Sequence, residues 1–378
     1  MPPAPANLDA TAATPPPHFL ADLYTFQWST FSFRLPLVSA SAVALCLFVG
    51  ILAGHPGGGL IAGGGAFTIG FGANQRIADS RLVPMMVAVF GCSTATLAGT
   101  IAGHKDFWLV VAASVSAFIY GVLTTRNAGL SWVGQQASVA LLVASAFPTP
   151  LGPALVRAGL IAAGGIVQVL FTSAGLKLIP DLPKDLLSIA ISVANNVQVQ
   201  DQEELMQRIR ELRRSLHPVT ATDTLVYSLR LVVTVAIATE VYRRIGIQSG
   251  YWIPMTAVLV QRPAFSETFT RALARILGTL AGAWLGSLLI AYVTPGPMVL
   301  AVIATMFALL EFATNSVNYG LFAACLTGYI VFLLSLNQIP GPVIAHRRAW
   351  CTILGGLIAL ILHVDALRRL RSSSAPAN

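Results

Sequence analysis

Arg271 and Arg275 stand four residues apart just before a long apolar segment, so a helix would place their guanidinium groups on one face. The planar fork of an arginine side chain matches a carboxylate through two parallel hydrogen bonds. Gln261 and Arg262 open the same polar stretch, "QRPAFSETFTRAL" at residues 261–273, and their side chains are further donors. The chemistry that these residue types could support is the binding of a carboxylate.

The apolar segment that leads into this stretch is short for a membrane span. From Ile247 to Arg262 it has 16 residues, whereas a helix needs about 20 to cross roughly 30 Å of hydrocarbon. One interpretation is a broken helix that ends inside the membrane, with Gln261 and Arg262 donating to a carboxylate. The other, which the sequence favours, is that packing absorbs the mismatch and Arg262 anchors the inner interface.

Two glutamates, Glu311 and Glu240, lie in expected spans and are candidates for proton coupling. A charged side chain at the centre of a span costs about 2.5–3.5 kcal/mol on insertion scales, so such residues are usually functional. For Glu311, a proton-coupling role and an interfacial position near Asn315 both stay open. Glu240 lies one turn before Arg243 and Arg244, and an ion pair with these neighbours is the favoured account.

Arg157 and Arg348 occupy equivalent positions near the outer ends of two further expected spans. Arginines on the outer side oppose the usual positive-inside bias, so they need a separate reason. Two of them across a pseudo-two-fold axis would form a positive mouth that concentrates anions. Two side chains that only reach the outer interface explain the positions equally well.

The chain has too few charged residues for the surface of a soluble protein of this length. It has 378 residues, of which 55% are hydrophobic and 10% charged, and its mean hydropathy is +0.73. Soluble proteins carry roughly 25% charged residues, so the chain is predicted to be an all-α polytopic membrane protein. The net charge of +8 is scattered over short loops, which argues against a nucleic-acid partner and for topology signals.

Little in the sequence indicates an enzyme, a metal site or a cofactor. The four cysteines all lie in apolar runs without metal-ligand spacing. His104 with Asp106, and His363 with Asp365, stand at span ends without a nucleophile, metal or nucleotide motif. We therefore expect no catalytic residue, no metal and no cofactor.

Apolar runs between polar breaks predict about twelve spans in two sets of six. The expected spans lie near residues 35–54, 57–73, 82–103, 107–125, 130–147 and 151–175, and near 226–242, 249–262, 272–292, 297–314, 319–336 and 345–364. Short matches recur in the same order in both sets: "SFRL" and "SLRL", "TLAGTIAG" and "TLAGAWLG", "NAGL" and "NYGL", "RAGLIAAGG" and "RAWCTILGG". They indicate an internal duplication, that is, two parallel six-helix repeats related by a pseudo-two-fold axis along the membrane normal.

These features divide the chain into five segments. They are a disordered tail that ends in an interfacial aromatic helix (1–33), a first membrane repeat (34–176), a cytoplasmic helical linker (177–224), a second membrane repeat (225–365) and a basic cytoplasmic tail (366–378). With the N-terminus in the cytoplasm, 17 Lys and Arg residues fall on the inner side and 6 on the outer side. Both termini are therefore expected to be cytoplasmic.

The run "GYWIPMTAVLVQRPAFSETFTRALARILGTLAGAWLG", residues 250–286, resembles the signature of the fusaric acid resistance-like membrane family. That signature has an aromatic pair and a proline entering a short helix, a Gln-x-Pro loop, and paired arginines leading into a Gly-Thr-x-x-Gly helix. The matching residues are Tyr251, Trp252, Pro254, Gln261, Pro263, Thr268, Arg271, Arg275, Gly278, Thr279 and Gly282. The first repeat lacks the aromatic pair, and the linker is shorter than the large cytoplasmic domain of many relatives.

The family is similar to aromatic carboxylic acid efflux pumps and to the aluminium-activated malate transporters of plants, which are anion channels. The resemblance implies export of aromatic or hydrophobic carboxylates across a bacterial inner membrane, and it makes Arg271 and Arg275 the better candidates for the inner anion site. Tyr251 and Trp252 are further substrate-binding candidates. Proton exchange, passive conduction and a non-transporting scaffold stay open. The expected partners are a small organic anion and the bilayer, while a homo-oligomer and an envelope partner of an efflux system stay open.

Overall fold

The computed structural model describes residues 20–77, 80–176, 221–292, 296–337 and 339–363. Apart from short 3-10 turns and one isolated bridge between Ile77 and Ser80, the secondary structure of this part of the chain is α-helical. The predicted linker helix in 177–220 and the predicted tails at 1–19 and 366–378 lie outside the described residues. The first helix after the linker begins at Ala221, within the segment assigned to the linker from sequence.

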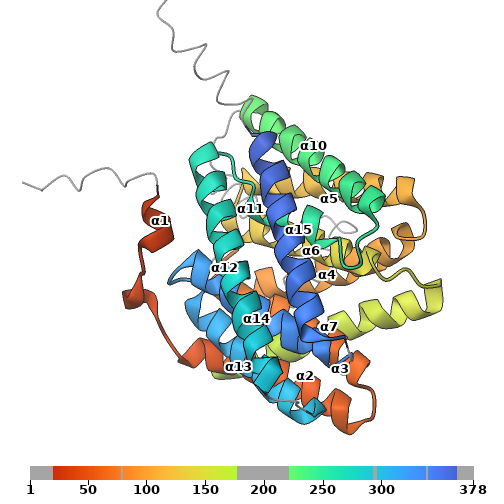
Figure 1. Ribbon diagram of the computed structural model, residues 1–378, viewed down its shortest axis with the longest axis vertical. Helices are drawn as coiled ribbons and strands as arrows, with labels where there is room; N and C mark the ends of the chain where they lie inside the picture. The colour runs from red at the N-terminus through yellow and green to blue at the C-terminus, as the bar shows by residue number, and fades with distance from the viewer. Residues whose placement is uncertain (1–19, 78–79, 177–220, 293–295, 338, 364–378) are drawn as a thin grey trace, which may run out of the picture.

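Twelve helices of nine residues or more form two consecutive sets in the described ranges. The first set comprises α2 (Arg34–Leu52), α3 (Pro56–Gly70), α4 (Leu82–Ala102), α5 (Asp106–Thr124), α6 (Ala128–Ser145) and α7 (Leu151–Gly175). The second set comprises α10 (Ala221–Ile245), α11 (Trp252–Val260), α12 (Phe265–Tyr292), α13 (Pro297–Thr314), α14 (Tyr319–Ser335) and α15 (Gly341–Ile361). Figure 1 shows them as one bundle of packed helices.

Eight of the described helices are long and apolar enough to cross a membrane, namely α2, α4, α5, α7, α10, α12, α13 and α15. The expected spans near 57–73, 130–147, 249–262 and 319–336 correspond to α3, α6, α11 and α14, which are not among these eight. Helix α14 is apolar but has only 17 residues. The prediction of about twelve helices is thus confirmed within the described residues, and eight of these helices meet this measure of a membrane span.

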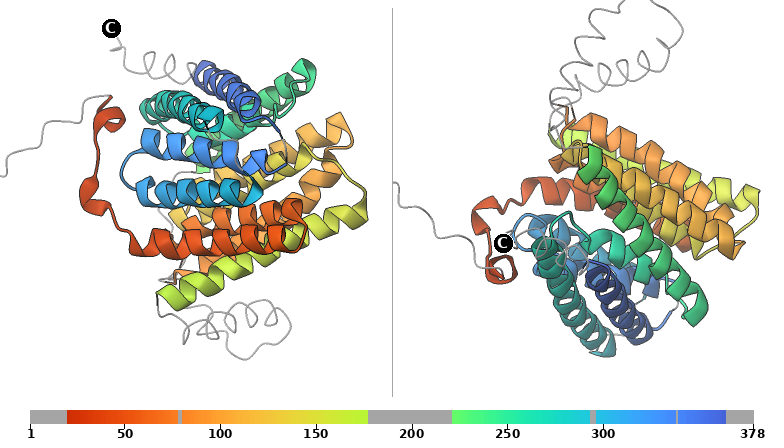
Figure 2. Two further views of the ribbon diagram at one scale, coloured as in Figure 1. Left: turned by 60° about the horizontal axis from the view of Figure 1, so that its bottom comes forward. Right: turned by 90° about the horizontal axis from the view of Figure 1, so that it is seen from above.

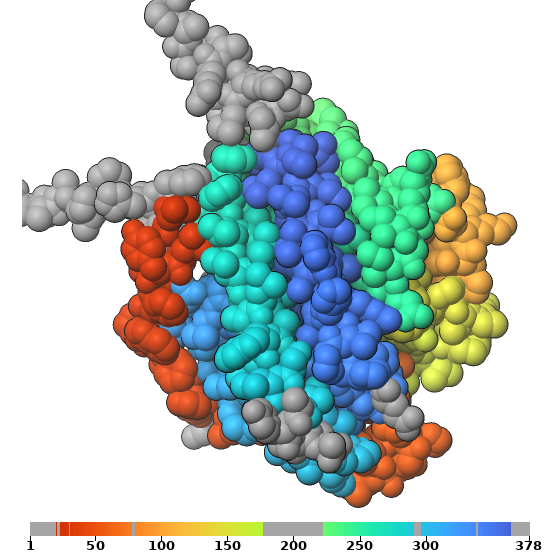
Figure 3. All heavy atoms as spheres, in the orientation of Figure 1, coloured from red at the N-terminus to blue at the C-terminus, as the bar shows by residue number. Residues whose placement is uncertain are grey.

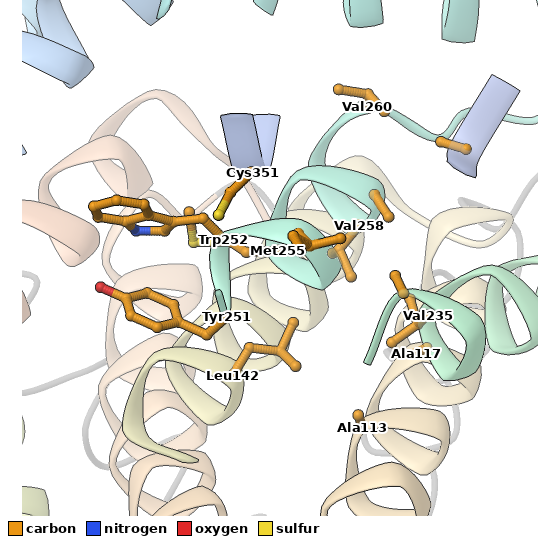
Figure 4. Close-up of a cluster of buried hydrophobic side chains, with 14 of the residues drawn as sticks. Ala113, Ala117, Leu142, Val235, Tyr251, Trp252, Met255, Val258, Val260 and Cys351 are labelled. Carbon is orange, nitrogen blue, oxygen red and sulfur yellow. The ribbon is translucent and has the colours of Figure 1, made fainter. Parts of the chain in front are cut away.

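Helix α11 is much shorter than a membrane span. It has 9 residues, which at a rise of about 1.5 Å per residue reach only about half of the roughly 30 Å of hydrocarbon. Eight of its residues are buried. The surrounding helices therefore keep the backbone N–H and C=O groups at the two ends of α11, which a short helix leaves without helical hydrogen bonds, away from lipid. Figure 4 shows Tyr251, Trp252, Met255 and Val258 from this region packed in the core near Cys351.

The helix contacts of the two sets correspond to each other. In the first set, α4 packs against α6 and α7, α3 packs against α7, and α5 packs against α6. In the second set, α12 packs against α14 and α15, α11 packs against α15, and α13 packs against α14. The sets meet where α5 packs against α10 and where α2 packs against α13.

The helix starts support the "NAGL" and "NYGL" match but not the "TLAG" match. Asn127 and Asn318 each accept hydrogen bonds from two backbone amides at the start of α6 and of α14. Gly99 packs on the Leu141 carbonyl of α6, 14 residues after Asn127, whereas Gly282 packs on the Ala324 carbonyl of α14, 6 residues after Asn318. The two "TLAG" segments therefore do not occupy matching positions, although their glycines serve the same close helix packing.

The segment before α2 is not the single aromatic helix expected from the sequence. Residues 20–33, called the strap below, contain a four-residue helix, α1 (Ala21–Tyr24), and one 3-10 turn at Trp28–Thr30. The strap runs along one end of the bundle from α1, which contacts α12 and α14, to the start of α2 (Figure 2, left; Figure 3). We call this end, where α2, α12 and α14 begin and α13 ends, the strap end.

Candidate anion-binding site

Arg271 and Arg275 of α12 meet the same side chain, Tyr319 at the start of α14. The guanidinium carbon of Arg271 lies 4.0 Å from the centre of the Tyr319 ring, and Nη1 of Arg275 donates to the Tyr319 hydroxyl at 3.3 Å. The predicted common face of the two arginines is confirmed by this shared contact. A cation over an aromatic face is stabilised by the ring quadrupole, so Tyr319 fixes the position of both groups.

A cavity of about 210 Å³ opens beside Arg271 at the strap end. It lies between the strap, α12 and the loop that joins α13 to α14, and its lining residues are Thr25, Gln27, Thr270, Arg271, Ala274, Asn315, Ser316, Val317, Asn318 and Tyr319. Among these lining residues Arg271 carries the one charge. Arg275 follows one helical turn deeper, about 6 Å along the axis, and is 1% exposed. The arginine pair thus leads from an open cavity into the bundle.

Glu311 is buried inside the bundle, in the last turn of α13. It is 0% exposed, and neither carboxylate oxygen has a hydrogen-bond partner within the described structure. The positive charges that act on it are those of Arg348 and Arg275, yet neither forms a salt bridge with it in the described structure. A buried charge without a partner is costly, so a proton or a further ion would stabilise this cluster.

Arg348 of α15 is also buried, at 1% exposure, instead of lining an outer mouth. Its Nε donates to Thr327 Oγ1 at 3.1 Å, and its guanidinium carbon lies 5.3 Å from the centre of the Trp252 ring. Its Nη1 atom has no hydrogen-bond partner in the part of the chain that is described. Tyr251 and Trp252 are themselves core residues, so they surround Arg348 and do not line the cavity.

Arg157 of α7 differs from Arg348. Its Nη1 donates to the backbone carbonyl of Phe147, its guanidinium lies 5.6 Å from the Phe147 ring centre, and the residue is partly exposed. The structure therefore does not place the two arginines as matching residues of an exposed mouth. The Arg157 side chain instead contacts Phe147, in the loop between α6 and α7.

Gln261 and Arg262 form the turn between α11 and α12. Nη1 of Arg262 donates to the Tyr120 hydroxyl at 3.0 Å, and its backbone N–H donates to Thr268 Oγ1 at 2.9 Å. Gln261 is 0% exposed, and its side-chain amide has no partner among the described residues. Arg262 thus joins the two helix sets through α5, in addition to any role at the membrane interface.

Two further residues hold this turn in place. Nη2 of Arg230 donates to the carbonyls of Arg262 at 3.2 Å and Pro263 at 2.9 Å. The His363 Nε2 lies 3.2 Å from the Arg262 carbonyl, and its Nδ1 lies 3.5 Å from Arg230. Burial, and then the charge of Arg230, lower the pKa of His363 below its usual value, so the neutral ring that donates through Nε2 is favoured.

Glu240 belongs to an ion-pair cluster at the opposite end of the bundle. It pairs with Arg243, and with Arg244 at 2.7 Å, and Arg243 also pairs with Asp106 of α5 at 2.8 Å. The favoured account of Glu240, an ion pair with its helix neighbours, is confirmed. This carboxylate is therefore satisfied locally, unlike Glu311.

Comparison with known proteins finds a family match in the second helix set. Residues 234–362 match the family model described as "Fusaric acid resistance protein-like". The resemblance seen in the sequence is confirmed over that range. Every site residue from Glu240 to Arg348 falls inside the matched range, whereas Arg157 lies outside it.

Curated relatives match similar lengths of the chain. An uncharacterised protein of Synechocystis is 26% identical over 144 residues, 38% of this chain and 19% of that protein. The protein called ORF2 of Neisseria gonorrhoeae is 29% identical over 133 residues, 35% of this chain and 32% of that protein. The inner membrane protein YccS of Escherichia coli is 29% identical over 151 residues, 39% of this chain and 20% of that protein. The matches thus span about a fifth to a third of these relatives, and no solved structure matches the chain significantly.

Tyr319, Tyr120 and Thr327 are site residues that the sequence reasoning missed. Each belongs to the site because it contacts an arginine that is distant in the chain. The separations are 44 residues for Tyr319, 142 for Tyr120 and 21 for Thr327. One signal was available for Tyr319, because it is the second residue of the repeated "NYGL" motif, where the first copy has alanine. A bulky polar residue that replaces a small one in a repeat marks a difference between the two halves.

Proposed function

We propose that this protein transports small organic anions, in particular aromatic or hydrophobic carboxylates, outward across a bacterial inner membrane. The observation that carries the proposal is the arginine pair on Tyr319, which leads from a cavity to the uncompensated Glu311 and Arg348. The family match supports a membrane transporter-like protein of this type. The name of one relative, an inner membrane protein, supports the location.

The charges of the site favour an anionic substrate. Arg275 and Arg348 act on one carboxylate, Glu311, and Arg271 adds a third positive charge one helical turn from Arg275. One N–H position of each of these arginines has no partner among the described residues. Arginine cannot lose its charge by deprotonation as lysine does, so the excess must be compensated by an anion. A carboxylate that binds in place of water supplies both the charge and the acceptors.

The strap end is proposed to face the cytoplasm. Arg34, Arg76, Arg81 and Arg126 all lie at this end, in agreement with the positive-inside bias of the whole sequence. The corresponding helix contacts of the two sets support an arrangement as parallel repeats about an axis along the membrane normal. Substrate would then enter the cavity from the cytoplasm.

We assign proton coupling to Glu311, which is buried beside the arginines and has no ionic partner in the described structure. A substrate anion next to Glu311 favours its neutral form, because like charges repel. Binding of the anion and of a proton therefore support each other, and this linkage is reciprocal. Proton exchange, which the sequence left open beside passive conduction, requires that the anion and the proton weaken each other's binding. The sign of the pH gradient that drives flux therefore distinguishes exchange from cotransport.

The experiment is uptake of labelled benzoate into proteoliposomes under pH gradients of either sign. Wild type is compared with Arg271→Ala/Arg275→Ala and, as a matched control, with Arg243→Ala/Arg244→Ala at the opposite end. Flux that requires the first pair but not the second supports the proposal, and its dependence on the gradient separates exchange, cotransport and passive conduction. Absence of flux for a panel of carboxylates would favour a non-transporting scaffold.

A further inference from the structure

The strap forms one wall of the cavity beside Arg271. Thr25 and Gln27 of the strap line the cavity together with Ala274 and Tyr319. The strap is joined to the loop before α14 by backbone and side-chain hydrogen bonds, since the Gln27 N–H donates to the Val317 carbonyl at 3.1 Å. This wall is therefore a short segment outside the twelve-helix bundle, joined to it by polar contacts of the strap and by the packing of α1 on α12 and α14.

Asn318 provides two of these contacts while it also caps α14. Its Oδ1 accepts from the backbone amides of Gly320 at 2.8 Å and Leu321 at 3.1 Å. Its Nδ2 donates to the strap carbonyls of Leu23 at 3.3 Å and Thr25 at 3.1 Å. The matching residue Asn127 caps α6 in the same way, and no strap contact of its side chain is recorded among the described residues. A comparison of the two asparagines therefore distinguishes the effect of capping, which both provide, from the effect of binding the strap, which only Asn318 is seen to provide.

The opposite edge of the strap is apolar and exposed. Tyr24 is 62% exposed, Trp28 59% and Phe33 57%, and Phe26 stacks on Trp28 with a centroid distance of 5.9 Å. Aromatic side chains next to the start of a span are typical of the membrane–water interface. One edge of the strap therefore suits the bilayer surface and the other closes the cavity.

We propose that the strap is the gate of a binding site for a small single-ring carboxylate, with Arg271 as the anion partner and Asn318 as the latch. The inference rests on the proposed function for the identity of the ligand, but the gate itself is a property of the strap. The cavity volume of about 210 Å³ is below the roughly 300–1,000 Å³ of sites for drug-sized ligands, which limits the ligand to a small molecule. The cavity is partly open with the Asn318 contacts formed, so release of these contacts widens the entrance to the site and renewed contact narrows it behind the substrate.

The test measures access to the cavity with a thiol at its inner wall. Ala274 lines the cavity and is 5% exposed, so Ala274→Cys reports the opening through its rate of reaction with N-ethylmaleimide in proteoliposomes. The native cysteines Cys46, Cys92, Cys325 and Cys351 are buried, and wild type gives their background rate. Asn318→Asp keeps the capping oxygen but removes the donors to the strap, and Asn127→Asp makes the same change where no strap contact is recorded.

We expect Asn318→Asp to accelerate the labelling of Ala274→Cys at least threefold and Asn127→Asp to leave it unchanged. Phe26→Ala/Trp28→Ala removes aromatic side chains that anchor the strap at the bilayer surface and adds no charge. It should also accelerate the labelling of Ala274→Cys. Benzoate should slow the labelling in the latched protein. Equal rates in the two aspartate variants would overturn the gate, and labelling that benzoate does not slow would overturn the carboxylate site.

The outcomes also separate this inference from the proposed function. If wild type carries no benzoate flux but Asn318→Asp still opens the cavity selectively, the proposed transport fails while the gate stands. If flux is arginine-dependent but the two aspartate variants label alike, the transport proposal stands and the gate fails.

Discussion

Two clusters of charge lie at different places in the bundle, and their comparison separates a structural from a functional use of the same residue types. At one end, Asp106, Glu240, Arg243 and Arg244 pair with each other, and the side chains of Arg244 and Asp106 are 79% and 71% exposed. Inside the bundle, Arg275, Glu311 and Arg348 are at most 1% exposed and form no ion pair in the described part of the chain. Paired, solvated charges contribute little to stability, whereas unpaired buried charges are costly, and another ion or a proton would lower that cost.

The largest expected effect follows from removing the deeper arginine. Arg275→Leu removes the charge but keeps apolar contacts, and a hydrogen bond to a charged group is worth about 1.5–3 kcal/mol, or roughly 10- to 150-fold in affinity. Benzoate flux at low concentration should fall by about that factor. Arg244→Leu is the matched control in the paired cluster and should change flux less than about twofold; equal losses in both variants would erase the distinction between the clusters.

Glu311→Gln tests the unpaired carboxylate. The amide keeps the shape and removes the charge, so flux driven by a pH gradient should be lost while passive exchange of benzoate persists. Because the change removes a buried charge that lacks an ionic partner, thermal unfolding should occur at the same or a higher temperature. Transport that keeps its full response to the gradient would remove Glu311 from the mechanism, and Glu240→Gln, in the paired cluster, is the control that should leave the response intact.

Tyr319→Phe sharpens the account of the arginine pair. The ring remains under Arg271, but Arg275 loses its hydroxyl partner at 3.3 Å. The lost bond has a charged donor and belongs to the class worth about 1.5–3 kcal/mol, but Tyr319 only positions Arg275, so we expect part of this free energy to affect substrate binding. The KM for benzoate should change by roughly two- to tenfold with little change in the maximal rate. Tyr319→Leu, which removes the ring as well, should reduce both, and identical behaviour of the two variants would contradict the role given to the hydroxyl.

The smallest expected effect concerns pH and stability at the α11–α12 turn. The pKa of His363 is lowered by burial and by Arg230, so the unfolded chain binds this proton more readily than the folded protein. The stabilisation is therefore fully present above the unfolded value of about 6.5 and is lost as pH falls below it. Unfolding temperature measured from pH 8 to 5 should fall on acidification, and His363→Gln should show a shallower fall; an unchanged slope would show that other groups dominate.

Much of the fold could be predicted because helices in a membrane follow from local composition. Apolar runs located the helices, and the 16-residue segment before Arg262 indicated a short helix, which is shorter still in the structure, with the 9 residues of α11. The repeated "NAGL" and "NYGL" segments proved to contain the caps Asn127 and Asn318, although the match indicated only the repeat and not the caps. The register of "TLAG" could not be predicted in the same way, because small residues recur often in helices that pack closely.

The site could be predicted only in part, because its geometry depends on contacts between distant segments. The common face of Arg271 and Arg275 follows from helical periodicity alone. Their meeting point on Tyr319 requires α12 to pack against α14, and the strap contact of Asn318 joins residues 295 positions apart. The burial of Arg348 was also unpredictable, since its first-repeat match Arg157 reaches only a nearby carbonyl.

The central claim is that the unpaired arginines hold a carboxylate, and equilibrium binding of labelled benzoate to the purified protein in detergent tests it most directly. Wild type and Arg243→Ala/Arg244→Ala should bind with the same affinity, while Arg271→Ala/Arg275→Ala should lose at least 10-fold, as expected for the loss of a charged hydrogen-bond partner at about 1.4 kcal/mol per tenfold. Binding that is equal in all three proteins would contradict the claim.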